Sequence, residues 1–265
     1  MPELPEVEHT GRNLTRWMRG ARIAGVSVLD PRIIRPTSPR AFTRALAGRR
    51  VERVERRGKW LRLGLDDGRK VFVHLGMTGW FVPSSVGAPP VRFERVHFDV
   101  DRRGRRSRIA YVDPRRWGRM VLARDDTPTW SSLGPDPLAD RLDLDALATK
   151  LARRKRSIKE VLLDQRVLAG VGNIQAIEAL WRARIDPRSR ASALSSNDVR
   201  ALVRGLTWTL LRTLADLAKG DAGADNPFRI YGRRGEPCPR CGKALARVEL
   251  GGRTTTFCPA CQVRR

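Results

Sequence analysis

The sequence lacks any run of about 18 apolar residues, the length that an α-helix needs to cross a membrane. Its first ten residues, MPELPEVEHT, have neither the basic start nor the apolar stretch of a secretory signal. These two absences exclude a membrane-spanning helix and argue against export. A cytoplasmic, reducing location is therefore expected by default.

Acidic residues are scarce, since 28 Asp and Glu stand against 53 Lys and Arg and leave a formal net charge of +25. Such an excess predicts a polyanionic partner, with nucleic acid as the first candidate. A high-arginine composition that only keeps the protein soluble is the alternative. The 265 residues are enough for one large or two small domains with a hydrophobic core.

Cysteine is absent from the first 237 residues and occurs four times in the last 28. Two Cys-x2-Cys pairs, Cys238 with Cys241 and Cys258 with Cys261, are separated by sixteen residues. This spacing is typical of one structural zinc ion held by four thiolates, with no open coordination position. A segment this short cannot bury enough core to fold alone, so the metal would supply folding free energy. Disulfides are disfavoured in a reducing compartment.

The first half of the sequence has the alternation of β-strands, flanked by helices. A helix is predicted over residues 5–19, and a second over 38–48. Residues then alternate in the manner of strands over 61–65, 71–75 and 96–100, and a further apolar run follows at 109–112. A hairpin signal, Asp66-Asp67-Gly68, lies between the first two of these runs. The pattern favours a β-sandwich or barrel with flanking helices.

The pattern becomes helical after residue 127. Ser157 and Glu160 form a capping box that opens a helix, and Gly170 and Gly172 interrupt it. Further helices are predicted over 142–153, 174–184 and 195–219. The expected protein is of the α+β class, with three domains: a β-rich domain at 1–127, a helical domain at 128–227 and a four-cysteine zinc hairpin at 228–265.

The N-terminus carries a possible nucleophile. Removal of Met1 before the small Pro2 is expected, which would leave a free secondary amine. An α-amino group titrates near ~7.7–8.0, against ~10.4 for lysine, so at neutral pH it is far more often in the neutral, nucleophilic form. Such an amine can attack a sugar carbon and form a Schiff base. From these residues alone, a stiff prolyl tail is the favoured interpretation, with Glu3 and Glu6 only complementing a helix N-terminus.

Six blocks together resemble the formamidopyrimidine-DNA glycosylase family (Fpg), which is related to the endonuclease VIII enzymes. They are MPELPEVE, RRGKWLRL around Lys59, VHLGMTG ending at Gly79, YVDPRRWG at 111–118, GVGNI at 170–174, and YGRRGEPC before the zinc module. The blocks follow the family's order and span nearly the whole chain. Leu4 resembles the glycosylase branch, because the endonuclease VIII branch usually has Gly there.

The resemblance implies an N-terminal β-sandwich, a helix–two-turns–helix domain and a zinc-binding β-hairpin. It also implies a bifunctional DNA glycosylase and AP lyase of base excision repair that excises oxidised purines, namely formamidopyrimidines and 8-oxoguanine. Pro2 would attack C1′ of the damaged nucleotide and form a Schiff base, while Glu3 would protonate the opening sugar ring. β- and δ-elimination would then cut the strand. Lys59 matches the family's active-site lysine, and Arg253 matches the zinc-hairpin arginine that contacts phosphate.

The same resemblance implies a set of DNA contacts. Met77, Arg115 and Trp117 match three residues that fill the gap left by an extruded base, although the family usually has Phe at the Trp117 position. Arg95 stands near the position of a family histidine. The full expected set is His74, Met77, Arg95, Arg115, Arg116, Trp117, Arg154, Lys159 and Asn173. Taken singly, Met77 and Trp117 would be core residues, His74 a surface histidine and Asn173 a helix cap.

The expected partner is double-stranded DNA with oxidised bases or abasic sites, lying in a basic cleft between the halves. The protein is expected to be a monomer with no membrane association, acting in a bacterial-type cytoplasm at the nucleoid.

Two alternatives stay open: the same fold acting mainly on oxidised pyrimidines, and a non-catalytic nucleic-acid-binding relative. The joint presence of Pro2, Glu3, Lys59 and Arg253 argues against a mere binder. The short segment 220–227, where the family has a lesion-covering loop, favours formamidopyrimidines over 8-oxoguanine.

Overall fold

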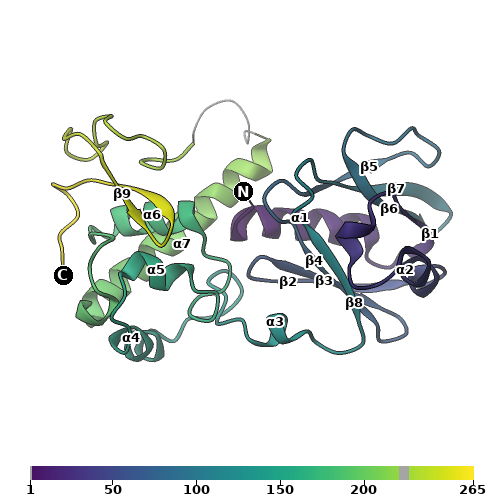
Figure 1. The fold of residues 1–265 in the computed structure, drawn as a ribbon, viewed down its shortest axis with the longest axis horizontal. Helices are drawn as coiled ribbons and strands as arrows, with labels where there is room; N and C mark the ends of the chain where they lie inside the picture. Colours follow the sequence, from purple (N-terminus) through teal and green to yellow (C-terminus); the bar gives the residue numbers. More distant parts are fainter. Residues whose placement is uncertain (1, 221–226) are drawn as a thin grey trace. The chain divides into compact units, whose positions relative to one another are not determined.

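The computed structural model describes residues 2–220 and 227–265, which divide into two units (Figure 1). The first unit holds Pro2 and residues 6–132, and the second holds residues 3–5 and 133–265. The chain therefore passes into the second unit between Pro2 and Glu3 and returns after Pro5. Helix α1 (Leu4–Met18) contains this return, so its first residues belong to the core of the second unit.

The first unit is a β-sandwich of two four-stranded antiparallel sheets, with the strand orders β1-β6-β7-β5 and β2-β3-β4-β8. Buried side chains of both sheets join one hydrophobic core, which confirms the sandwich expected from the alternating runs. The strands are β1 (Arg22–Val28), β2 (Val51–Arg57), β3 (Trp60–Leu65), β4 (Lys70–His74), β5 (Trp80–Ser84), β6 (Glu94–Arg102), β7 (Arg105–Val112) and β8 (Arg119–Ala123).

The hairpin between β3 and β4 forms at the predicted turn, where Gly68 has φ +81°. Strand β4 is covered on both faces, which the alternation alone does not indicate. Phe72, on the face opposite Val71 and Val73, is fully buried. Its ring meets Trp130 of the short helix α3 (Pro128–Ser131) at 5.5 Å between centroids.

Two short helical segments, η1 (Pro31–Ile34) and α2 (Pro39–Leu46), complete the first unit together with α1. The predicted cap of α2 is present, since the Ser38 hydroxyl accepts a hydrogen bond from the Ala41 N–H at 3.3 Å. Helix α1 ends before Gly20, which has φ +80° as expected of a helix stop. Both helices predicted in this half are therefore confirmed.

The second unit is helical and ends in a β-hairpin. Capping boxes open α5 at Ser157 and α7 at Ser195, and α7 ends at Gly220 in the left-handed conformation. The elements are α4 (Leu144–Ala152), α5 (Ile158–Leu163), α6 (Asn173–Arg182), η2 (Ala191–Ala193), α7 (Ser196–Lys219), β9 (Ala246–Leu250) and β10 (Arg253–Phe257). The predicted order of helices followed by a hairpin is confirmed.

Helix α6 connects the helical core to the cysteine-bearing segment. Ile177 and Trp181 of α6 pack against Cys238, Leu245 and Cys258. The buried carboxylate of Glu178 accepts three backbone N–H bonds, from residues 229, 230 and 231, at 2.9 to 3.0 Å. This carboxylate therefore fixes the start of the C-terminal segment on α6.

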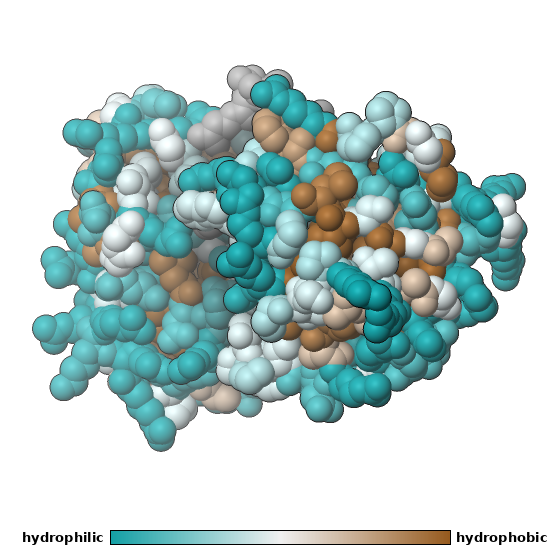
Figure 2. Space-filling model, turned by 45° about the vertical axis from the view of Figure 1, so that its right-hand side comes forward, coloured by the Kyte–Doolittle hydropathy of each residue, from teal (hydrophilic) through white to brown (hydrophobic). Residues whose placement is uncertain are grey.

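Hydrophilic residues cover most of the face seen in Figure 2, and hydrophobic residues appear there as patches interrupted by them. This surface agrees with the large excess of basic residues. No helix in the described part of the chain is long and apolar enough to cross a membrane.

Glu178→Gln tests the role of the buried carboxylate. A neutral amide offers one oxygen in place of two, so at least one N–H of residues 229–231 loses its acceptor. We expect unfolding free energy to fall by about 1–3 kcal/mol in denaturant titrations. The matched control is Glu236→Gln, because the Glu236 side chain is 53% exposed and the same change should cost little there. Equal losses in both variants would contradict this role.

Candidate active site

Glu3 caps helix α6 with its side chain. Its two carboxylate oxygens accept hydrogen bonds from the backbone N–H groups of Ile174, at 2.9 Å, and Gln175, at 3.0 Å. These N–H groups lie in the first turn of the helix, have no partner within it and carry the positive end of its dipole. Glu3 is only 1% exposed. A carboxylate held by two fixed donors in a buried place has a defined position and orientation.

Two glycines make room for this N-terminal segment. A Cβ atom at Gly172 would overlap the carboxyl carbon of Glu3. Gly170 has φ +90°, and a Cβ there would lie 2.5 Å from Leu4 Cδ1. The Leu4 N–H donates to the Gly170 carbonyl at 3.2 Å. The GVG sequence is therefore needed because residues 3 and 4 lie directly against its backbone.

A buried polar network supports the helix turn that holds Glu3. The Gln175 side chain donates to Thr213 Oγ1 at 3.1 Å and accepts from Thr209 Oγ1 at 3.0 Å. All three residues are buried, and both threonines belong to α7. The network fixes the first turn of α6 against α7. Sequence reasoning missed these residues, although two threonines four apart on the buried face of a long helix are a signal of such a network.

The zinc-hairpin residues meet α5 and α6 near the same helix end. Arg253 opens β10 after a turn in which Gly251 and Gly252 both have positive φ, and its side chain is exposed. Asn173 Nδ2 donates to the Thr254 carbonyl at 3.1 Å. Lys159 Nζ donates to the Leu250 carbonyl at 3.3 Å. The structure thus brings Lys159, Asn173 and Arg253 together.

Lys159 is fully buried, which is unusual for a lysine. Burial, together with the nearby positive charge of Arg253, lowers the pKa of its amine to about 8. Its hydrogen bond and that of Asn173 both support the hairpin. Phosphate contact by these two residues stays a prediction, as it does for Arg154, which is half-buried between α4 and α5.

In the first unit, Asp113 ties two loops together. Its buried carboxylate accepts hydrogen bonds from Thr78 Oγ1 at 2.6 Å, the Arg115 N–H at 3.2 Å and the Gly118 N–H at 2.8 Å. The loops touch through backbone, since a Cβ at Gly76 would lie 2.5 Å from the Trp117 carbonyl carbon. The hydrogen bonds to Asp113 and this backbone contact therefore fix the loop with Met77 against the loop with Arg115.

Trp117 stands out from this double loop, with 57% of its surface exposed. The Arg115 guanidinium carbon lies 4.3 Å from the centre of the Trp117 ring. This exposure excludes the interpretation of Trp117 as a core residue. Arg116, also exposed, has φ +59°, which is rare for a residue other than glycine. Met77 is half-buried and belongs to no hydrophobic core cluster.

Arg95 and His74 support the same loops from β6 and β4. Arg95 Nε donates to the Asp113 carbonyl at 2.9 Å. His74 Nδ1 accepts the Gly76 N–H at 3.1 Å. Burial, with the positive charges of Lys59 and Arg119, lowers the pKa of His74 to about 4. His74 is therefore neutral at pH 7 and carries its proton on Nε2.

The four cysteine sulfurs fit one zinc ion. All lie within 4.8 Å of one another, with Cys238 and Cys261 at 4.0 Å and Cys241 and Cys258 at 3.6 Å. Zinc–sulfur bonds of ~2.3 Å in a tetrahedron require sulfurs about 3.8 Å apart. The Trp181 indole N–H donates to Cys238 Sγ at 3.4 Å, a contact suited to a thiolate. The structural zinc expected from the spacing is thus supported by the donor set.

The expected site residues fall into two groups. Glu3, Lys159, Asn173 and Arg253 belong to the second unit, while Pro2, Lys59 and the His74–Trp117 loops belong to the first. The Pro2–Glu3 peptide bond joins the groups in the chain. Residues 221–226, on which the expected lesion preference depends, lie outside the described part of the structure, so that expectation stays a prediction.

Comparisons with known proteins decide the family. The chain matches the N-terminal and H2TH domains of formamidopyrimidine-DNA glycosylase over residues 1–120 and 133–221, and a zinc finger found in FPG and IleRS over 235–263. The formamidopyrimidine-DNA glycosylase of Laribacter hongkongensis is 39% identical, covering 99% of this chain and 100% of the relative. The Moorella thermoacetica enzyme is 43% identical, covering 94% of each. The chain belongs to the formamidopyrimidine-DNA glycosylase family.

Solved structures agree with this assignment. Lactococcus lactis Fpg, in a complex with DNA that contains an abasic site, has a TM-score of 0.89 to this chain at 29% identity. The similarity covers 99% of this chain and 100% of the other. Family membership makes the protein a DNA glycosylase of base excision repair, and AP lyase activity is characteristic of the family.

Gly172→Ala tests the placement of Glu3. Gly172 has φ −119° and ψ −167°, which alanine also adopts, and the nearest atoms that the new methyl group would meet all belong to the Glu3 side chain. We expect base excision to fall by at least ~10²-fold in single-turnover assays, as for loss of a general acid. Gly25→Ala is the control, because nothing lies within 4 Å of its Cβ position. Normal excision by Gly172→Ala would refute the need for this placement.

The lowered pKa of His74 predicts that the free energy of unfolding depends on pH. This pKa falls from 6.5 to about 4 on folding, so between these values the unfolded chain binds more protons than the folded protein. The stabilisation is complete above pH 6.5 and is lost as the pH falls toward 4, by up to about 3 kcal/mol. His74→Asn keeps an acceptor for the Gly76 N–H but does not titrate there. Denaturant unfolding at pH 7 and 4.5 should therefore show a shallower pH slope for the variant, and equal slopes would contradict the assignment.

Proposed function

We propose that the protein excises oxidised purines from double-stranded DNA and then cuts the strand, with the Pro2 amine as nucleophile. The observation that carries this proposal is the fixed carboxylate of Glu3, the residue directly after Pro2. A disordered prolyl tail would not place an acid so rigidly. Capping α6 alone would not require the carboxylate to stand next to the terminal amine, whereas proton transfer during the reaction does.

The reaction begins when the neutral Pro2 nitrogen attacks C1′ of the damaged nucleotide. The bond from C1′ to the base breaks and the base leaves with its electron pair. The Pro2 nitrogen gives its proton to the Glu3 carboxylate, and Glu3 then delivers that proton to the ring oxygen of the sugar as the ring opens. The product is an iminium ion between Pro2 and C1′. The iminium makes the C2′ protons acidic, so β-elimination of the 3′ phosphate and then δ-elimination of the 5′ phosphate follow.

Oxidised purines are the proposed substrates because two relatives were solved in complex with DNA that contains them or an analogue of them. One is Lactococcus lactis Fpg with DNA containing Fapy-dG, and the other is MutM with DNA containing carbocyclic 8-oxo-G. In this chain, the exposed Trp117 ring and the Arg115 guanidinium stacked on it form a planar wedge. Such a wedge suits the gap that an extruded base leaves in the duplex.

The remaining site residues act on the DNA backbone or on the residues that touch it. Arg253 is an exposed cation beside the turn of the zinc hairpin and matches the family arginine there, so we assign it to phosphate. Lys159 and Asn173 hold that hairpin, and Arg95 holds the Asp113 loop. His74 offers a neutral N–H donor to phosphate, and Lys59 lies near it. Arg116 and Arg154 add positive charge for the duplex.

The zinc ion would be held by the four cysteines and would stabilise the fold of the hairpin that carries Arg253. Its closed thiolate set leaves no position for substrate. We also propose that the protein acts as a monomer at the nucleoid of a bacterial-type cell, where chromosomal DNA is its substrate. We propose the three domains 1–127, 128–227 and 228–265. The first carries the nucleophile Pro2, the second carries the α6 turn that binds Glu3, and the third carries Arg253.

Borohydride trapping on abasic or lesion-containing duplexes tests the nucleophile. The mature protein should form a stable crosslink whose peptide map places DNA on Pro2. An uncleaved N-terminal tag should abolish the crosslink and leave duplex binding intact, because it blocks only the amine. Normal crosslinking by the tagged protein would move the nucleophile elsewhere, with Lys59 as the first candidate.

Glu3→Gln isolates the acid within the same assays. It nearly preserves the side-chain shape but removes the proton-transferring carboxyl group and leaves one N–H of Ile174 or Gln175 without its acceptor. Excision should therefore fall at least ~10²-fold while duplex affinity changes little. Glu52→Gln, on the exposed edge of β2, is the matched control and should excise normally. Wild-type excision by Glu3→Gln would remove Glu3 from the reaction.

A further inference from the structure

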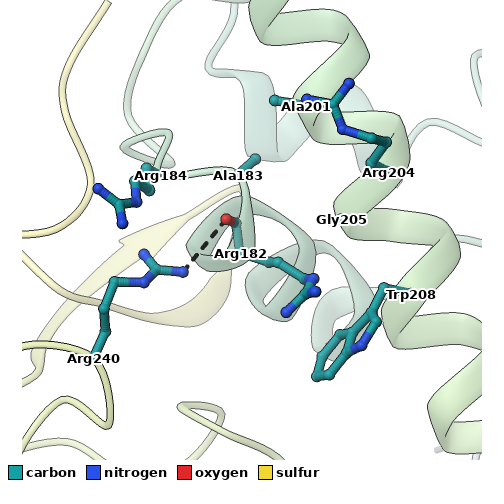
Figure 3. Close-up of a pocket in the computed structure, with 8 residues that line it drawn as sticks. All are labelled: Arg182, Ala183, Arg184, Ala201, Arg204, Gly205, Trp208 and Arg240. Atoms are coloured by element: carbon teal, nitrogen blue, oxygen red, sulfur yellow. Dashed lines mark hydrogen bonds between the residues drawn. The ribbon is translucent and has the colours of Figure 1, made fainter.

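A second basic site lies at the other end of helix α6 from Glu3. A pocket of about 480 Å³ lies between the C-terminal end of α6, one face of α7 and the segment between Cys238 and Cys241. Figure 3 shows the residues that line it. Four arginines line it, Arg182, Arg184, Arg204 and Arg240, together with Trp208 and three small residues. The ten residues of α6 separate the pocket from the Glu3 cradle by about 15 Å.

Two of these guanidinium groups are held in place by the protein. Arg240 donates to the carbonyls of Trp181, at 3.0 Å, and Arg182, at 3.4 Å, and lies 4.4 Å from the Trp181 ring centre. The Arg182 guanidinium carbon lies 4.0 Å from the centre of the Trp208 ring. Stacking on indole orients the planar guanidinium and leaves its N–H edges available for a ligand. The pocket therefore has preorganised donors.

The other two arginines carry uncompensated charge. Arg184 and Arg204 are exposed, and neither makes an ion pair or a side-chain hydrogen bond with any residue that the structure describes. None of the residues that line the pocket is acidic. Arg184 also has φ +60° just beyond the end of α6, where glycine is favoured. Four like charges around one concavity repel one another unless an anion is present.

We propose that this pocket binds adjacent phosphate groups and is separate from the residues that act on the lesion. Guanidinium forks match phosphate oxygens in pairs, and a cavity of this volume suits a small ligand or a short extended segment rather than a flat surface contact. The phosphates would come from a free oligophosphate or from a second segment of nucleic acid. Both sources present the same chemistry to the four arginines.

Calorimetric titration with inorganic tripolyphosphate at constant ionic strength tests the site. The wild-type protein should bind the probe with one site per chain. Arg184→Ala/Arg204→Ala should weaken binding at least about tenfold, because two charge-assisted contacts are lost. Arg40→Ala/Arg44→Ala removes the same charge from two exposed arginines of α2 and should change binding less than about twofold. Equal weakening in both double variants, or no wild-type binding, would overturn the proposal.

A second arm distinguishes the sources and the lesion site. The protein is first saturated with a short duplex that carries a tetrahydrofuran abasic-site analogue, and tripolyphosphate or an eight-nucleotide oligothymidylate is then added. Retained tripolyphosphate binding supports a separate pocket. Additional oligothymidylate binding that is lost in Arg184→Ala/Arg204→Ala identifies nucleic acid as the source, and its absence identifies a free oligophosphate. Displacement of tripolyphosphate by the duplex would overturn the proposal, because the pocket would then belong to the lesion-binding surface.

Discussion

The hydrogen bonds between the Glu3 carboxylate and the first turn of α6 are the constraint on which the site depends. Successive turns of α6 each hold a different part of the second unit. Its first turn binds Glu3 and, through Gln175, helix α7. Its middle turn binds residues 229–231 through Glu178, and its last turn contacts the metal centre through Trp181. One helix of ten residues therefore positions the acid, the long helix and the zinc segment together.

A buried carboxylate is costly unless its charge meets fixed donors. Glu3 meets them at the end of a helix whose dipole also favours negative charge. Local sequence suggested that Glu3 and Glu6 complement the start of their own helix, and the structure shows why that interpretation is incomplete for Glu3. Its partners lie 171 and 172 residues away in the chain. No periodicity or capping rule reaches that far, whereas the family motifs identify both ends of the contact.

Local patterns predicted the elements whose signals are local. The capping box at Ser157, the turn at Gly68 and the cysteine spacing each depend on a few neighbouring residues, and each was found as expected. Strand β2, VERVERR, was missed because charge hides its alternation. It is held by pairing with β3 and by ion pairs such as Glu55 with Arg62 at 2.9 Å. Lys159 was expected to contact DNA, and nothing in the local sequence indicated that it is buried and donates to the Leu250 carbonyl of the hairpin.

The two ends of α6 are stabilised in the same way by distant parts of the chain. At the start of α6, the negative carboxylate of Glu3 accepts hydrogen bonds from backbone N–H groups. At the end of α6, the positive guanidinium of Arg240 donates to the carbonyls of Trp181 and Arg182. Arg240 lies between two cysteines of the metal centre, so its position requires that this segment be folded. The zinc site, although chemically closed, thus contributes to the helix that orients the acid. The folded cysteine segment also forms part of the arginine pocket, because the Arg240 guanidinium that caps α6 lines the cavity beside it.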